Sequence, residues 1–415
     1  MRSHDVPPVT QFLTIIADDD WKHNRNSLTP AFTSGKLKKM TDSICKAAES
    51  FVEALKEKAD KHEPMDVKQF TSGYTMEVIA ATSFGMKLDA QKADDDPFVK
   101  YAMKFFKVSV TNPFVLASFV CPFVLPIMKL LKISAMPTDS IDFFKKIVDQ
   151  ALEQRRSNPG KYNDFLQLMI TAENQARSAE TQSHDDDGLK GGEVQQSNWK
   201  DKRMGQGLSD SEILAQCITF FVAGFDTSAA TIAYALYHLT MNPECQQKLV
   251  DEIDDYYPGG KVPDYDELPE MPYLNMVINE TLRMNPPAAR VDRMCTRDTV
   301  VRGLHIPAGM PVAIPIYNIH RDPEYWDEPD TFNPERFSPE NRASHHPLQW
   351  IPFGHGPRNC IGMRLALLEI RIALVYLFQK YRFVPNSKTL PLRFGESLFL
   401  TNPKDGIWVT PQHRD

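Results

Sequence analysis

Apolar residues recur along much of this chain at intervals of three and four, the spacing typical of amphipathic helices. The longest such stretch runs from Ser209 to Met241 without a proline. It opens with Ser209-x-x-Glu212, the pattern of a capping box, and at 1.5 Å per residue it would extend about 50 Å. Further helices are predicted over Trp21–Lys61 with a turn near 33–35, Asp66–Phe84, Phe98–Lys107, Asp139–Arg156, Asn163–Glu173, Pro243–Tyr256, Pro272–Met284, and from just after Cys360 to about Tyr381.

The last third of the chain carries a minor β portion. After Pro286-Pro287 come short runs of β-forming residues, and the tail over Phe383–Val409 alternates as a hairpin does. The runs before the tail are Arg290–Cys295, Thr299–Arg302, His305–Ile306 and Met310–His320. No βαβ alternation is present, so the pattern predicts a mainly α fold with a minor β region.

Two segments depart from this pattern. Residues 174–207 are rich in Ser, Gln, Asp and Gly and nearly lack large apolar residues, which predicts a mobile surface loop. Residues 113–128 read PFVLASFVCPFVLPIM, without a charge, but they hold three prolines and fall short of the ~20 residues of a spanning helix. Two interpretations are open for this second segment: short buried core elements, or an apolar surface that enters a bilayer from one side.

Composition narrows the class of protein. The 415 residues are 42% hydrophobic and 24% charged, which is typical of a folded globular protein. A net charge of −7 argues against a general nucleic-acid binder. The first 20 residues do not show the basic and apolar regions of a signal peptide.

The motif with the clearest chemistry is FGHGPRNCIG, residues 353–362. Its glycines and proline predict a tight loop, which places Cys360 at the start of a helix. Free N–H groups and the helix dipole stabilise a thiolate there, and a thiolate is a soft anionic ligand for haem iron. The alternative for a lone cysteine is an ordinary buried residue in a turn.

Two further patterns carry charge in apolar surroundings. Asp226 and Thr227 lie within the apolar run CITFFVAGF-DT of the longest helix, either as a proton relay or as a polar pair satisfied inside a helix. Glu280 and Arg283 are three residues apart, so both side chains lie on one helical face. This pair becomes informative together with a second motif, Pro334-Glu-Arg336-Phe337.

With these motifs the chain resembles the cytochrome P450 superfamily, the haem-thiolate monooxygenases. WKHNR at 21–25 followed by LTPAFTSGKLKKM is most similar to the animal branch that holds the subfamily-3 drug-metabolising enzymes and thromboxane synthase. The resemblance implies a single domain over 1–415, a mainly helical fold with a small β region, and haem b as cofactor.

The resemblance also implies roles for individual residues. Cys360 is the axial iron ligand, Thr227 and Asp226 relay protons, and Glu280, Arg283 and Arg336 form a structural triad. The residues expected to bind the haem are Trp21, Arg25, Arg293, Phe353, Arg358 and Gly362. Those expected to line an apolar substrate pocket are Val108, Val110, Thr219, Val222, Ala223, Ala288 and Arg290. Each arginine taken alone is better explained as a solvated surface residue, and the haem role is expected of them as a set.

The partners follow from the same resemblance. Because no flavin or nicotinamide motif is present, electrons are expected from NADPH–cytochrome P450 reductase. Candidate docking residues are Lys22, Lys36, Lys38, Lys39 and Arg364, although scattered solubilising charges explain them equally. The resemblance favours a membrane surface contact through 113–128 and a place on the cytosolic face of the endoplasmic reticulum membrane.

The family pattern expects a longer portion before Trp21, with a membrane anchor, the first helices and the first sheet strands. We therefore expect a P450 fold that lacks these elements and leaves the strand near 310–320 with an exposed edge. The function expected is insertion of one oxygen atom from O2 into an apolar small molecule. The alternatives are a thromboxane-synthase-like isomerase that acts on a peroxide without reductase, and an inactive truncated chain.

Overall fold

The computed structural model describes residues 9–91, 97–106, 137–158, 164–171, 207–395, 401 and 403–414. Contacts divide the chain into two compact units. The first unit comprises Met1–Ser43 and Met76–Gly224, and the second unit comprises Ile44–Thr75 and Phe225–Asp415. The boundaries fall inside three helices, α2, α3 and α9, and the single domain over 1–415 stays a prediction.

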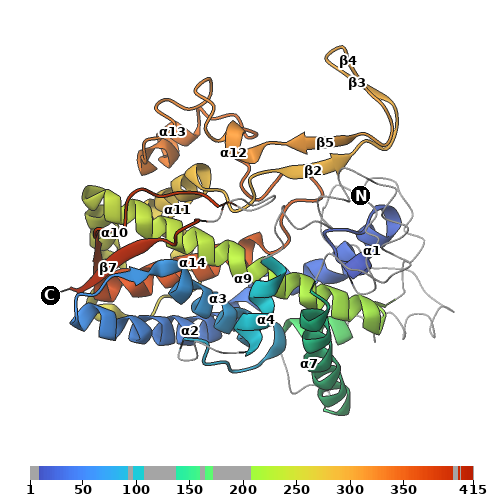
Figure 1. The fold of residues 1–415 in the computed structure, drawn as a ribbon, viewed down its shortest axis with the longest axis horizontal. Helices are drawn as coiled ribbons and strands as arrows, with labels where there is room; N and C mark the ends of the chain where they lie inside the picture. Colours follow the sequence, from blue (N-terminus) through green and yellow to red (C-terminus); the bar gives the residue numbers. More distant parts are fainter. Residues whose placement is uncertain are drawn as a thin grey trace. The chain divides into compact units, whose positions relative to one another are not determined.

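The helices match the predicted ones closely (Figure 1). A 3-10 turn at Thr29–Phe32 separates the first two helices, a few residues before the turn predicted near 33–35. The helices are α1 (Asp18–Leu28), α2 (Ser34–Asp60), α3 (Val67–Phe84), α4 (Pro97–Phe106), α7 (Thr138–Ser157), α9 (Asp210–Met241), α10 (Pro243–Tyr256), α11 (Pro272–Met284), α12 (Ile316–Ile319), α13 (Pro339–Arg342) and α14 (Met363–Lys380), with 165–171 also helical.

The start of α9 has the predicted capping box. Glu212 Oε2 accepts hydrogen bonds from the Ser209 backbone N–H at 2.9 Å and from its hydroxyl at 2.8 Å. The Glu212 backbone N–H in turn donates to Ser209 Oγ at 3.3 Å. The other carboxylate oxygen of Glu212 accepts from Asn24 Nδ2 at 3.3 Å, so the cap also fixes α1 against α9 within the first unit.

The strands form three small antiparallel sheets. In the second unit β7 pairs with β6 and with β1, while β2 pairs with β5 and β3 with β4. The β3–β4 hairpin extends from the far end of the β2–β5 ribbon (Figure 1). The strand bounds are β1 (Met65–Asp66), β2 (Val291–Met294), β3 (Thr299–Val301), β4 (Leu304–Ile306), β5 (Pro311–Ile314), β6 (Tyr381–Val384) and β7 (Trp408–His413).

The predicted strand over Met310–His320 is too long. Only Pro311–Ile314 is a strand, and Ile316–Ile319 forms the short helix α12. Pro315 separates the two because its ring removes the N–H that would continue the strand, while its carbonyl accepts from Ile319 N–H at 3.0 Å. In the part of the chain that the structure describes, β5 has one neighbour, β2.

Several predictions fall outside the described residues. These are the apolar segment 113–128, the loop at 174–207 except for its last residue, and the two pocket residues Val108 and Val110. Within the described ranges, α9 is the one helix long and apolar enough to cross a membrane, and 72% of its most apolar window is buried inside the protein.

The first unit depends on a buried ion pair. Arg155 on α7 is 3% exposed and binds the Asp164 carboxylate, which is 5% exposed. Arg155 also donates to the Phe84 carbonyl at the end of α3, and Asp164 accepts from the Gln167 N–H at 3.0 Å. Gly85 follows with φ +59°, and a Cβ there would lie 2.6 Å from Asp164 Oδ2. The pair therefore fixes the end of α3 against α7.

Asp164→Ala should lower the free energy of unfolding by about 3–5 kcal/mol, because it leaves the Arg155 guanidinium buried without its carboxylate. Urea unfolding followed by circular dichroism measures this. As the control, Asp149→Ala breaks the exposed Lys145–Asp149 pair on α7, the helix that carries Arg155. It should change the free energy of unfolding by less than about 1 kcal/mol. Equal effects of the two substitutions would contradict the role given to the buried pair.

Candidate functional site

The loop before α14 is closed on itself by backbone hydrogen bonds. Gly354 and Gly356 have φ of +71° and +81°, a region that favours glycine. The Gly354 N–H donates to the Ile351 carbonyl at 2.9 Å, and the Cys360 N–H donates to the Phe353 carbonyl at 2.8 Å. The motif is therefore a compact loop that delivers Cys360 three residues before Met363, where α14 begins.

The surroundings of Cys360 fit a haem-thiolate site in their chemistry. Cys360 is exposed, although cysteine is among the residues most often buried. Three apolar residues near it in the sequence, Phe353, Ile361 and Leu365, are only half-buried, and so is Arg358, two residues before it. A thiol near a helix N-terminus, an apolar rim and a cation are the groups that a flat apolar ring with carboxylate substituents would contact.

The predicted triad is assembled. Arg283 binds Glu280 through two parallel hydrogen bonds, from Nε to Oε2 at 2.7 Å and from Nη2 to Oε1 at 2.8 Å. Both side chains are fully buried on α11. Arg336 lies 3.5 Å from Glu280 Oε1, and the Asn333 N–H donates to that same oxygen at 2.9 Å. Burial raises the pKa of Glu280, and the Arg283 guanidinium opposes part of that rise.

Arg283 also organises the irregular chain that follows α12. Its Nη1 donates to the carbonyls of His320 and Pro329, each at 2.9 Å. The indole ring of Trp326 lies 5.3 Å from the centre of the guanidinium, close enough for a cation–π contact. One buried cation thus fixes two backbone segments and an aromatic ring, which supports the structural role predicted for it.

Asp226 has a partner that the sequence reasoning missed. Its Oδ1 lies 2.7 Å from Nζ of Lys68, in the first turn of α3, and both side chains are largely buried. The other oxygen, Oδ2, accepts no hydrogen bond from the described residues. The only signal in the sequence was a lone lysine on an apolar helix, and the pairing of α3 with the second half of α9 could not be read from it.

The other predicted residues of α9 have different exposures. Thr219 is buried and donates to the Ala215 carbonyl at 2.8 Å. Ala223 is exposed and Val222 and Thr227 are half-buried, although most of this helix is buried. Gly224 lets α3 approach closely, because a Cβ there would lie 3.0 Å from Ile79 Cδ1.

The residues predicted to bind the haem propionates lie on separate elements. Trp21 and Arg25 are half-buried and one turn apart on α1, in the first unit. Arg293 is half-buried on β2 in the second unit, and its Nη1 donates to the Asp292 carbonyl at 2.9 Å. Their roles toward a haem stay predictions.

The two predicted pocket residues before β2 also belong to the second unit. Ala288 is half-buried. Arg290 is exposed and forms an ion pair with Asp292 at 3.6 Å, which is the behaviour of a surface arginine. A part in substrate binding stays a prediction for both.

Glu369 is a buried acid that the sequence reasoning did not single out. It lies on α14, nine residues after Cys360, and is 2% exposed. Burial raises its pKa to about 8, and the hydroxyl of Ser228, the residue after Thr227, opposes part of that rise. Its carbonyl accepts from the Tyr74 hydroxyl at 2.8 Å. In the sequence it is one acid on a helix, and only packing shows that it points inward.

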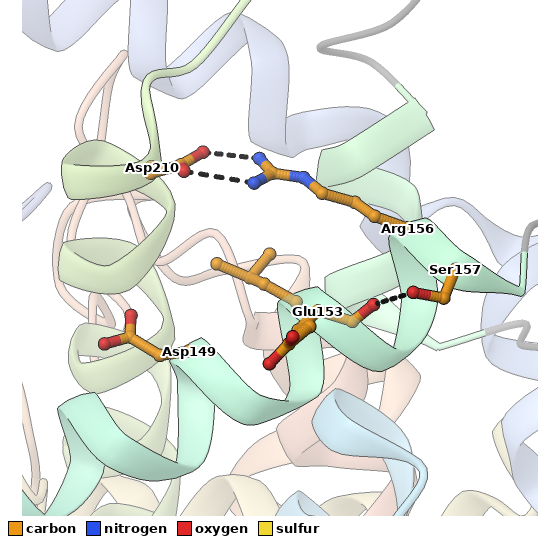
Figure 2. Close-up of a pocket in the computed structure, with 6 residues that line it drawn as sticks. Asp149, Glu153, Arg156, Ser157 and Asp210 are labelled. Atoms are coloured by element: carbon orange, nitrogen blue, oxygen red, sulfur yellow. Dashed lines mark hydrogen bonds and ion pairs between the residues drawn. The ribbon is translucent and has the colours of Figure 1, made fainter.

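The described residues that line a hollow in the first unit include none of the predicted site residues. Figure 2 shows it between α7 and the start of α9, with Arg156 and Asp210 joined across it. Its lining is mostly charged and includes Asp149 and Glu153. A substrate site for an apolar molecule needs apolar walls, so this hollow is not a candidate.

Comparisons with known proteins agree with these motifs. A sequence profile of the family "Cytochrome P450" matches residues 1–409. Cytochrome P450 3A11 of Mus musculus is 40% identical over 405 residues, which are 96% of this chain and 76% of the relative. Cytochrome P450 3A6 of Oryctolagus cuniculus is also 40% identical, over 97% of this chain and 76% of its own length. Cytochrome P450 3A14 of Cavia porcellus is 39% identical over 94% and 74%.

Glu369→Gln should change how stability depends on pH. Between pH 4.5 and about 8 the folded protein keeps a proton on Glu369 that the unfolded chain releases, so this residue lowers stability as pH rises. Relative to the variant, wild type should lose about 1.4 kcal/mol of unfolding free energy per pH unit in that window.

Urea unfolding at several pH values measures this difference. The buried histidines His238 and His320, whose pKa values burial lowers to about 4, are present in both proteins and cancel. Glu53→Gln removes an exposed carboxyl of α2 and serves as the control. A Glu369→Gln variant that follows wild type at every pH would show that Glu369 is not protonated in the folded protein.

Proposed function

This chain belongs to the cytochrome P450 family of monooxygenases, and we propose that it is a haem-thiolate enzyme that inserts one atom of O2 into an apolar small molecule such as a steroid, lipid or xenobiotic. The observation that carries this proposal is the exposed Cys360, held at the start of α14 by a closed loop and bordered by half-buried apolar residues.

Haem b is the cofactor that these residues fit. Cys360 would supply the axial thiolate, with Phe353 and Gly362 beside it. Arg358, Arg293, Trp21 and Arg25 would supply the positive and N–H groups that two propionates need. The bound haem provides O2 activation, and the thiolate donates electron density that favours O–O cleavage.

Protons are the part of the reaction that the chain itself must supply. Thr227 is half-buried, and its hydroxyl can both accept and donate a proton. Asp226 is held through Oδ1 by Lys68, and its other oxygen, Oδ2, is buried and accepts no hydrogen bond from the described residues. We assign to Asp226 the uptake of protons and to Thr227 their delivery toward the haem side of α9.

The electron donor in this proposal is NADPH–cytochrome P450 reductase. Its acidic face would meet a basic surface, for which Lys38, Lys39 and Arg364 are exposed and Lys22 and Lys36 are half-buried. We place the enzyme at the cytosolic face of the endoplasmic reticulum membrane, with substrate bound by Thr219, Val222, Ala223, Ala288 and Arg290 and by Val108 and Val110.

The test of this function is a carbon-monoxide difference spectrum of the reduced protein, followed by turnover with and without reductase. We expect the red-shifted Soret band of thiolate ligation in wild type and its loss in Cys360→Ala. Turnover of a peroxide substrate without reductase would instead show an isomerase of the thromboxane-synthase kind. Absence of bound haem in the purified wild-type chain would overturn the proposal.

Thr227→Ala should lower the yield of product per NADPH consumed by roughly a hundredfold, because the group that delivers protons is lost. The carbon-monoxide spectrum should stay as in wild type, since Thr227 is not a ligand. Thr231→Ala is the matched control one turn along α9, where the hydroxyl only donates to the Thr227 carbonyl at 2.9 Å. An unchanged yield in Thr227→Ala would remove this residue from the relay.

A further inference from the structure

His320 is hydrogen-bonded both to the buried ion pair of α11 and to the segment that leads to Cys360. It follows α12 and is fully buried. Its carbonyl accepts from Arg283 Nη1 at 2.9 Å, and its ring nitrogen Nε2 accepts from the Ile351 N–H at 2.9 Å. Its backbone and its side chain thus connect two sites that are far apart in the sequence.

The ring of His320 must be neutral to make this contact. A backbone N–H can donate only to an imidazole nitrogen without a proton, which assigns the ring proton to Nδ1. Burial lowers the pKa of His320 to about 4. The positive charge of Arg283 acts in the same direction, and the backbone groups of Leu282 and Arg283 oppose part of the change. The acceptor is therefore available throughout the physiological range.

The contact at Ile351 continues to the cysteine through the loop itself. The Ile351 carbonyl accepts from the Gly354 N–H at 2.9 Å, and the Phe353 carbonyl accepts from the Cys360 N–H at 2.8 Å. Pro352, the next residue, has no N–H, so the Ile351 N–H is the last backbone donor before that proline. Fixing Ile351 fixes the residue from which the loop starts.

A second contact lies one residue earlier. Trp350 Nε1 donates to the Asn279 carbonyl of α11 at 3.1 Å. This bond attaches the side chain of Trp350 to α11, whereas His320 attaches the backbone of Ile351. The difference matters because the His320 bond holds the backbone of the residue from which the loop starts, whereas the Trp350 bond holds a side chain.

We propose that His320 is a positioning residue for the haem ligand, which couples the Glu280–Arg283 pair to the Cys360 loop through the Ile351 N–H. In this arrangement the buried Glu280–Arg283 pair holds His320, and the His320 ring accepts the hydrogen bond that holds Ile351. The pair thereby stabilises thiolate ligation by Cys360. The inference rests on the proposed function, because it concerns Cys360 as the ligand.

The test compares three substitutions in the full chain. His320→Leu removes the acceptor at similar volume, and His320→Gln keeps an acceptor oxygen near the place of Nε2. His238→Leu is the matched control: His238 is also buried, with Nε2 2.6 Å from Asn285 Oδ1, but it makes no contact with the loop. Two measurements are made on each protein: conversion of the thiolate carbon-monoxide band to the shorter-wavelength band, and amide hydrogen exchange over 350–362.

We expect His320→Leu to convert roughly tenfold faster than wild type, and its loop amides to exchange roughly tenfold faster, the effect of losing one buried hydrogen bond. His320→Gln should stay close to wild type, and so should His238→Leu over these residues. Equal conversion rates in His320→Leu and His238→Leu, or no rescue by glutamine, would overturn the inference.

The same experiment distinguishes failure of the proposed function from failure of the inference about His320. A wild-type protein without the thiolate band would overturn the proposed function and the inference that rests on it. A wild-type band together with unchanged band conversion and exchange in His320→Leu would overturn the inference alone.

Discussion

The second unit is organised around a fully buried ion pair, Glu280 with Arg283. Burying two charges costs several kcal/mol per ion, so such a pair persists only where further hydrogen bonds satisfy the remaining donors and acceptors. Here Arg283 also donates hydrogen bonds to the backbone carbonyls of His320 and Pro329, and Glu280 accepts one from the Asn333 N–H. The chain from His320 to Arg336 has little regular structure. Its hydrogen bonds to this pair hold it in place, as the backbone hydrogen bonds of helices and strands do elsewhere.

The cysteine loop depends on that order. A loop of glycine and proline has little side-chain packing of its own, so its position must come from its ends. One end is α14, whose first residue follows Gly362, and the other is Ile351, bonded to the ring of His320. An exposed thiol can therefore have a defined position, because the backbone of its loop is held at both ends.

The second unit holds buried polar groups that the apolar pattern of the sequence does not reveal. Lys68 and Asp226 pair across α3 and α9, and Glu369 faces Ser228 from α14. Each is an ionisable residue whose helical neighbours are mostly apolar, and each is costly to bury without a compensating contact. Their positions on three helices of the second unit show that its core carries ionisable groups close to the predicted proton relay.

The sequence by itself determined the long helices, the capping box at Ser209 and Glu212, the motif around Cys360 and the shared helical face of Glu280 and Arg283, because spacing and turn chemistry are local properties. It gave too long a strand over 310–320, where Pro315 ends the ladder. Only tertiary structure decided that Lys68 pairs with Asp226, that Glu369 is buried and that His320 reaches Ile351. His320 and Ile351 are 31 positions apart, and Lys68 and Asp226 are 158 apart. The burial of Glu369 depends on which face of α14 other elements cover. A local sequence pattern contains neither kind of information.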